Sequence, residues 1–322
     1  MTHALSNHVL AYLDGRHAQL LKFWLSGGHA PQGATVQDHC DVIYSLKLIG
    51  KDGEISDAAI AAFLTLLDGY RLAGWTTDGA TNGLNVHNSA YVLACLNVLP
   101  GSKTARYERL LEHRSAAPDT LFDAATGMPR YPSKWGHHSW RVSHWLGGIP
   151  SILLSLERSG ARKAEPFLGT SARVRAAVDQ LINPRTGLLK AYRSELAQKA
   201  FRLAYGLRHD PVLGDIGGIV HVLWYDHATG RPYIANAALL KTARELFYAR
   251  QPFMEKYPYC LDFDVVQAVR TAAQQQGESL NAEDRDRARK MLVDIAAYLT
   301  EPGPEYSLHK LPGALAAYHE CE

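Results

Sequence analysis

The sequence has no excess of charge of one sign and no strong compositional bias. Its 34 lysines and arginines are balanced by 32 aspartates and glutamates, which leaves a formal net charge of +2 at pH 7. Proteins that bind nucleic acids usually carry a strongly positive surface, so we expect no nucleic-acid partner. The 26 glycines and 15 prolines among 322 residues are ordinary numbers, and they exclude a collagen-like or disordered chain.

Cysteines are few, and no segment is long and apolar enough to cross a membrane. The four cysteines are Cys40, Cys95, Cys260 and Cys321, and none belongs to a C-x-x-C pair, which argues against a disulfide framework. Asp14, Arg16 and His17 interrupt the apolar residues near the N-terminus, so we expect no secretory signal. The longest apolar run, 146–156, is about half of a membrane span. The cysteine pattern is typical of reduced thiols, and we therefore expect a cytoplasmic protein.

What the sequence does contain is a series of helical segments of two kinds. Segments of the first kind are amphipathic with charged faces, and they span 10–25, 56–70, 103–113, 171–181, 235–250 and 283–299. Segments of the second kind are apolar on all sides except near their starts, and they span 39–50, 87–99, 144–156, 215–225, 262–273 and 308–319. A helix without a polar face is typical of a buried helix. Alternating β patterns are nearly absent, apart from 188–192 and 231–234.

The two kinds of helix alternate along the whole chain. Equivalent points in the apolar segments, from Asp41 to Pro312, recur every 47 to 70 residues, and Gly-Gly-Ile stands both at 147–149 and at 217–219. A helical solenoid is one architecture with such a period. A solenoid does not require one series of its helices to be apolar on all sides, so we favour a closed ring of helical hairpins.

Six outer and inner helical hairpins resemble the (α/α)6 toroid. Six-hairpin glycosidases, several polysaccharide lyases, sugar epimerases, protonation-type terpene cyclases and protein prenyltransferases share this architecture. The resemblance implies an all-α single domain over 1–322, with the apolar segments as the inner ring. It also implies that the N-terminal ends of the inner helices surround the mouth of a central cavity.

Polar and aromatic side chains gather at those N-terminal ends and in the loops before them. Burying so many titratable groups without a function would be costly, so we expect a site for a small-molecule or oligosaccharide substrate. The predicted catalytic residues are Asp41, His87, Tyr91, His144, Asp215 and Asp264. The predicted substrate-binding residues are Trp75, Asn88, Trp135, Trp140, Arg141, Tyr205, Arg208 and Asp262.

Hydrolysis of a glycoside is one reaction that these residues fit. It needs two carboxylates, one as acid and one as base or nucleophile. Asp215 with Asp264 or Asp41 is the predicted pair. Tryptophan and tyrosine side chains near the mouth suit the apolar faces of sugar rings.

Elimination or epimerisation at a uronate is the second saccharide reaction. It needs a Tyr or His base and a group that neutralises the neighbouring carboxylate. The segment 85–91, Asn-Val-His-Asn-Ser-Ala-Tyr, is similar to the Asn-His-containing inner helix of some alginate-type lyases. That resemblance implies the following roles: base or acid for His87 and His144, proton donor for Tyr91, and carboxylate clamp for Asn88 and Arg141.

Three alternatives stay open. The segment 262–268 resembles the Asp-x-Asp-Asp-Thr-Ala motif of terpene cyclases, with Val265 and Val266 in place of the third Asp and the Thr, which makes an isoprenoid an alternative substrate. The second alternative is a zinc site with Cys260, Asp262 and His309 as ligands, because prenyltransferases and lanthionine-forming cyclases bind zinc at this end of the ring. We nevertheless expect no cofactor. A toroid that binds a glycan without acting on it is the third alternative.

Overall fold

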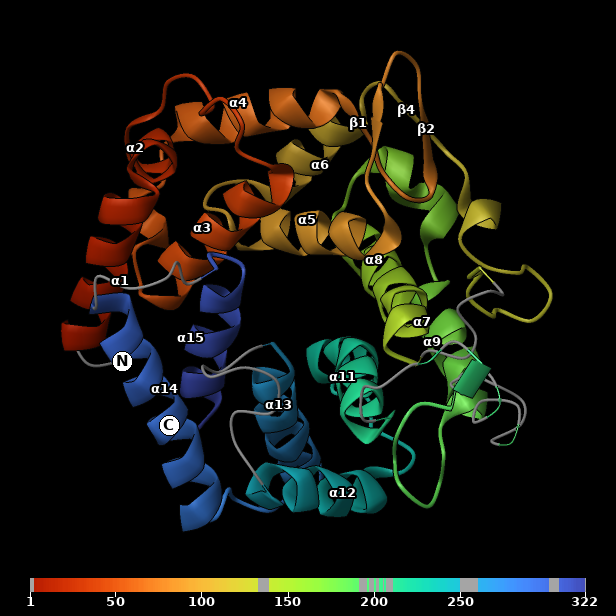
Figure 1. The fold of residues 1–322 in the computed structure, drawn as a ribbon. Coiled ribbons are helices and arrows are strands. Elements are labelled where there is room, and N and C mark those ends of the chain that lie inside the picture. Colours follow the sequence, from red (N-terminus) through yellow and green to blue (C-terminus); the bar gives the residue numbers. More distant parts are fainter. Residues whose placement is uncertain are drawn as a thin grey trace. The chain divides into compact units, whose positions relative to one another are not determined.

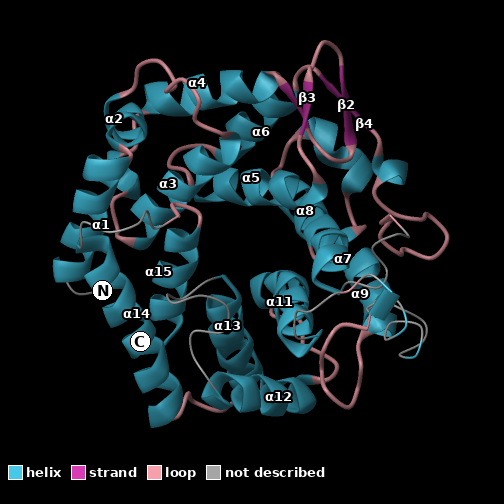
Figure 2. Ribbon diagram, viewed as in Figure 1, coloured by secondary structure: helices cyan, strands magenta, loops and turns pink. Residues whose placement is uncertain are grey.

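The computed structural model is mostly helical, which confirms the prediction of an all-α protein (Figures 1 and 2). It describes residues 3–132, 139–190, 196, 200, 203–204, 206, 211–249, 260–300 and 307–321. Within these ranges, β-structure is confined to two two-stranded sheets and isolated bridges. None of the helices in these ranges combines the length and the apolar character that a membrane span requires.

The chain divides into two compact units, each built from separate segments of the sequence. The first unit comprises Met1–Thr120, Ile152–Leu168 and Arg289–His319. The second unit comprises Leu121–Ser151, Gly169–Ala288 and Glu320–Glu322. Helices α8 (Gly148–Glu157) and α14 (Ala282–Thr300) contribute residues to both units.

The first unit is a set of packed helices with two small sheets. Its helices are α1 (His3–Arg16), α2 (Ala18–Ser26), α3 (Val36–Leu48), α4 (Asp57–Asp68), α5 (Val86–Val98), α6 (Lys103–Leu111) and most of α15 (Lys310–Cys321), with short 3-10 helices η1 (Asp52–Glu54), η2 (Pro118–Thr120) and η4 (Arg162–Phe167). Strand β1 (Tyr70–Arg71) is parallel to β3 (Asn82–Gly83), and β2 (Trp75–Thr77) is antiparallel to β4 (Arg114–Ala116). Helix α3 packs against α5, so two of the predicted apolar segments lie together.

The starts of α3 and α5 are fixed by side-chain caps. The Thr35 hydroxyl accepts a hydrogen bond from the Asp38 backbone N–H at 3.1 Å, and the Asp38 carboxylate accepts one from the Thr35 N–H at 2.8 Å. The side chain of Asn85 accepts from the Asn88 N–H at 2.8 Å. Such caps satisfy N–H groups that a helix start leaves unpaired. They place the first turns of α3 and α5 in a defined position.

A buried histidine lies in the core of the first unit. His39, on α3, is fully buried, and its ring lies 5.1 Å from that of Phe23, 5.7 Å from that of Trp24 and 5.4 Å from that of Phe63. Neither ring nitrogen has a hydrogen-bond partner among the residues that the structure describes. Burial lowers the pKa of His39 from 6.5 to about 4, and the charge of Asp38 opposes this shift. The neutral imidazole therefore packs as an apolar ring at neutral pH.

We expect His39 to make the protein less stable in acid. Because its pKa is lower in the folded chain than in the unfolded chain, stability is fully present above pH 6.5 and is lost as the pH falls from 6.5 towards 4. The shift corresponds to about 3 kcal/mol in the free energy of unfolding. Denaturant unfolding at pH 7 and pH 4 will show a pH dependence smaller by about that amount in His39→Leu. The exposed-residue control His29→Gln will keep the wild-type dependence, and an unchanged dependence in His39→Leu would contradict the assignment.

In the second unit, three of the helices pack side by side, with one in the middle in contact with the other two. Its helices are α7 (Ser139–Leu146), α9 (Ser171–Val178), α11 (Pro211–Thr229), α12 (Asn236–Ala249) and α13 (Cys260–Gln275), with the 3-10 helix η5 (Asp179–Leu181). Helix α11 packs against both α7 and α13, and α12 packs against α13. Close packing is possible because small residues stand at the crossings. A Cβ atom at Gly147 would lie 2.2 Å from the backbone oxygen of His221, so the two backbones are in direct contact.

A fully buried ion pair joins α9 to α11. Arg175 Nη2 lies 2.5 Å from Asp226 Oδ2, and both side chains are 0% exposed. Arg175 also contacts Asp179 at 2.7 Å, and Arg231 pairs with both Asp179 and Asp226. Burial raises the pKa of Asp226, and the charge of Arg175 opposes the shift. Each charge in this group depends on its partner, because a buried charge without one is strongly destabilising.

Candidate active site

Helices α3 and α5 bring two predicted catalytic residues into contact. Asp41, on α3, is fully buried, and it accepts a hydrogen bond at 2.6 Å from the hydroxyl of Tyr91, on α5. The hydroxyl of Tyr44 donates to the backbone oxygen of Tyr91 at 3.0 Å, and the two rings pack 4.8 Å apart. Tyr91 is therefore held on both sides, by its ring and by its hydroxyl.

A third residue completes this group from a distant part of the sequence. Nδ1 of His309, immediately before α15, lies 3.0 Å from Oδ1 and 3.3 Å from Oδ2 of Asp41. A carboxylate only accepts hydrogen bonds, so Nδ1 carries a proton, and in the neutral imidazole Nε2 carries the lone pair. The His309 side chain is 42% exposed, whereas that of Asp41 is 0% exposed. We call Asp41, Tyr91 and His309 the Asp41 cluster.

The surroundings of the Asp41 cluster keep the tyrosine protonated. Burial raises the pKa of Tyr91 well above its ordinary value, and the negative charge of Asp41 raises it further. The ring of His87 stacks on that of Tyr91, with centroids 6.5 Å apart and an 8° angle between the planes. Asn88, half-buried in the first turn of α5, lies three residues from Tyr91 and so shares its side of the helix.

Trp75 does not share this environment. Its side chain is 3% exposed and packs against Phe167 with ring centroids 5.1 Å apart. The residue stands in β2, whose first position faces the interior of the first unit. The structure thus places Trp75 in the core of the first unit.

In the second unit, α13 carries two predicted aspartates in different settings. Asp262 is fully buried, whereas Asp264 is partly exposed. Burial raises the pKa of Asp264 well above its ordinary value, and the charge of Asp262 adds to this shift. A Cβ at Gly217 would lie 3.2 Å from Oδ2 of Asp264 and 3.7 Å from the Trp140 ring. The raised pKa favours the protonated carboxylic acid, and Asp264 therefore fits the role of a proton donor.

Two imidazoles lie together on α7 and α11. The rings of His144 and His221 are 5.1 Å apart in an edge-to-face arrangement. Burial lowers the pKa of His144 to about 4, and the positive charge of Arg141 adds to the effect. Arg141 itself is exposed. His221 was not among the predicted residues, although one signal was present: it is a titratable residue in the middle of the otherwise apolar segment 215–225.

The predicted zinc ligands are divided between the two units. His309 belongs to the first unit and hydrogen-bonds to Asp41, whereas Cys260 and Asp262 lie in the first turn of α13 in the second unit. Trp135, Tyr205 and Arg208 lie outside the described residues. The same holds for the side chain of Asp215, whose backbone belongs to α11.

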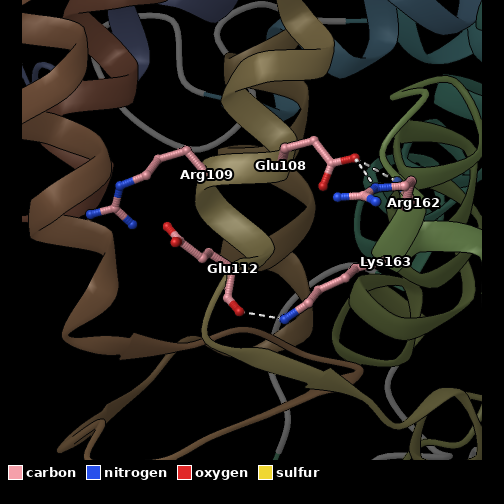
Figure 3. A pocket seen from close by; sticks show the side chains of 5 residues that line it. All are labelled: Glu108, Arg109, Glu112, Arg162 and Lys163. Atoms are coloured by element: carbon pink, nitrogen blue, oxygen red, sulfur yellow. Dashed lines mark hydrogen bonds and ion pairs between the residues drawn. The ribbon is translucent and has the colours of Figure 1, made fainter.

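The first unit also contains a charged pocket that none of the predicted residues lines. The pocket has a volume of about 530 Å³ and is lined by Glu108, Arg109, Glu112, Arg162 and Lys163 (Figure 3). The Arg162 backbone N–H donates to Glu108 at 2.8 Å, and Lys163 donates to the backbone oxygen of Glu112. Arg109 pairs with Asp68 at 2.5 Å. The side chains of Arg109 and Arg162 are therefore each paired with a carboxylate, Asp68 and Glu108 respectively.

The Asp41 cluster is the strongest candidate for chemistry because a buried carboxylate there holds a partly exposed imidazole. No protein-family model, no curated protein and no solved structure matches the chain.

Proposed function

We propose that the protein is a carbohydrate-active enzyme that uses the Asp41 cluster for elimination or epimerisation at a uronate. One observation carries the proposal: Asp41 accepts hydrogen bonds from both Tyr91 and His309 Nδ1. This arrangement directs the lone pair of Nε2 away from Asp41, on a side chain that is 42% exposed. A held imidazole with an accessible lone pair is suited to general-base catalysis.

The reaction needs only proton transfers by this chain. His309 Nε2 removes the proton from the carbon next to the uronate carboxylate. In elimination, the electron pair of that C–H bond forms a C=C bond, the C–O bond to the leaving group breaks, and the leaving oxygen takes the proton from the imidazolium. Asp41 stabilises the imidazolium and fixes its orientation, so it acts as a positioning residue. Tyr91 retains its proton and holds Asp41 from the other side.

The start of α5 supports an anionic substrate. Asn88 lies in the first turn of this helix, where the helix dipole favours a negative charge. The side chain of Asn88 is half-buried and stands on the same side of α5 as Tyr91. We therefore assign Asn88 to the carboxylate of the substrate.

The test is an activity screen with uronate polymers, followed by the absorbance of the unsaturated product. We expect His309→Gln to lower kcat by about 10²–10⁴-fold, since it removes the general base. His113→Gln, which changes a histidine with a 73% exposed side chain, is the matched control and will keep wild-type activity. Full activity of His309→Gln on a substrate that the wild type converts would overturn the proposal.

Asp264 supports a second candidate function, the protonation of an isoprenoid alkene. Burial and the charge of Asp262 raise the pKa of the Asp264 carboxyl, and a Cβ at Gly217 would lie near both this carboxyl and the Trp140 ring. A neutral acid can start cyclisation, and an aromatic ring can stabilise the resulting carbocation. Conversion of an isoprenoid by the wild type but not by Asp264→Asn would favour this candidate over the uronate reaction.

For the whole chain we propose the (α/α)6 toroid. The support is the packing of predicted inner segments on one another within each unit: α3 against α5, and α11 against α13. Neighbouring inner helices of such a ring are expected to pack in this way. A crystal structure of the full chain tests the arrangement, and an extended stack of hairpins would contradict it.

A further inference from the structure

The second unit contains a pair of histidines that the proposed function does not use. His144, on α7, is partly exposed, and His221, on α11, is buried. Their ring centroids are 5.1 Å apart, and one potential ligand nitrogen of each lies within 4.8 Å of that of the other. Both residues come from helices that are packed together, so the pair is part of the folded core of the unit.

A neighbouring serine fixes the tautomer of His221. The Ser143 hydroxyl donates its proton to the backbone oxygen of Trp140 at 2.6 Å, so its oxygen must accept from Nδ1 of His221, which lies 2.7 Å away. Nδ1 of His221 therefore carries the proton, and Nε2 carries the lone pair. Histidines that bind metals are usually held in this manner, by a hydrogen bond from the second ring nitrogen.

The backbone keeps the two helices at a fixed separation. A Cβ at Gly147 would lie 2.2 Å from the backbone oxygen of His221, so the segment after α7 touches α11 directly at the residue that carries the imidazole. The edge of the His221 ring also packs against Trp224 at 4.6 Å. His221 is thus supported by a hydrogen bond, by a ring contact and by the backbone of its neighbour.

We propose that His144 and His221 bind a first-row transition metal ion, of the class that includes Zn²⁺ and Co²⁺. Imidazole nitrogens are preferred ligands of these ions. Two nitrogens on one tetrahedral zinc ion stand about 3.3 Å apart at the usual bond length, so a small rotation of the rings would bring both onto the ion. Water or further protein groups complete the coordination, and Ser143 acts as a positioning residue.

The test is titration of the chelator-treated, full-length protein with Co²⁺ and Zn²⁺, followed by visible absorption and calorimetry. The wild type will bind one ion, with cobalt bands typical of nitrogen ligands. His144→Ala and His221→Ala will each weaken binding at least tenfold, and Ser143→Ala will weaken it by about 10–100-fold through loss of the supporting hydrogen bond.

Two controls separate a metal ligand from a structural role. His227→Ala changes another histidine of α11, one that contacts Arg270 at 3.1 Å, and it will leave the affinity unchanged. His144→Gln removes a ligand from a partly exposed position and will retain the far-ultraviolet circular dichroism of the wild type. Absence of stoichiometric binding, or equal affinity in wild type, His144→Gln and His221→Ala, would overturn the proposal. Alanine substitution of the other histidines in turn will identify any third histidine ligand.

Discussion

Asp41→Asn will lower kcat for the uronate reaction by about 10³–10⁴-fold. Asp41 accepts hydrogen bonds from both Tyr91 and His309, and its fully buried carboxylate compensates the charge of the imidazolium that forms when His309 takes a proton. An Asn side chain can donate to Nδ1, which would place the proton on Nε2 and remove the base. Steady-state kinetics with the substrate found in the screen will show the loss in kcat, with KM changed by much less.

A second aspartate on a nearby exposed segment provides the control. Asp52 pairs with Lys47 at 2.8 Å near the end of α3, and Asp52→Asn will leave kcat within about twofold of the wild type because exposed pairs contribute little. Circular dichroism will establish that both variants keep their helices. Wild-type kcat in a folded Asp41→Asn variant would contradict the role of Asp41.

Arg175→Met will lower the free energy of unfolding by about 3–5 kcal/mol. The substitution leaves Asp226 in the interior of the second unit without its closest positive partner, at a position where its side chain is 0% exposed. Arg231 stays near Asp226, at 3.4 Å, but its own closer contact is with Asp179. Guanidinium unfolding followed by circular dichroism measures the change.

A double variant distinguishes the cost of an unpaired charge from a general packing defect. In Arg175→Met with Asp226→Leu no buried charge of this pair remains, and most of the lost stability will return. Lys241→Met, at the exposed pair with Glu245, will cost about 0.5 kcal/mol or less. A double variant that is less stable than both single variants would show that the pair itself stabilises the fold.

The helices could be predicted because their signals are local. The predicted segments 39–50 and 87–99 correspond to α3 (Val36–Leu48) and α5 (Val86–Val98), since an apolar stretch behind a capping residue defines a buried helix. Asp41 and Tyr91 were found for the same reason: both are polar groups near the starts of apolar segments. Their direct hydrogen bond could not be predicted from one sequence, because it depends on the packing of α3 against α5.

Other residues of the candidate site could not be placed from the sequence, because their surroundings come from segments that are distant along the chain. His309 was predicted only as a zinc ligand, yet it pairs with Asp41 across 268 residues of sequence. Trp75 was predicted to bind substrate because it is aromatic and lies near a helix start, but its position in β2 turns it into the core. His221 was missed because a histidine in an apolar segment resembles a core residue until its neighbour His144 is known.

The tautomer of the His309 imidazole directly tests whether His309 can act as the general base, and it can be measured without a substrate. Protein labelled with ¹⁵N-histidine, recorded at a pH at which the imidazole is neutral, yields the protonation of each ring nitrogen from long-range ¹H–¹⁵N correlations, with His309→Gln identifying the signals. The hydrogen bond to Asp41 predicts a protonated Nδ1 and an unprotonated Nε2, and predicts that Asp41→Asn disturbs this tautomer. A wild-type spectrum in which Nε2 carries the proton would contradict the assignment of His309 as the base.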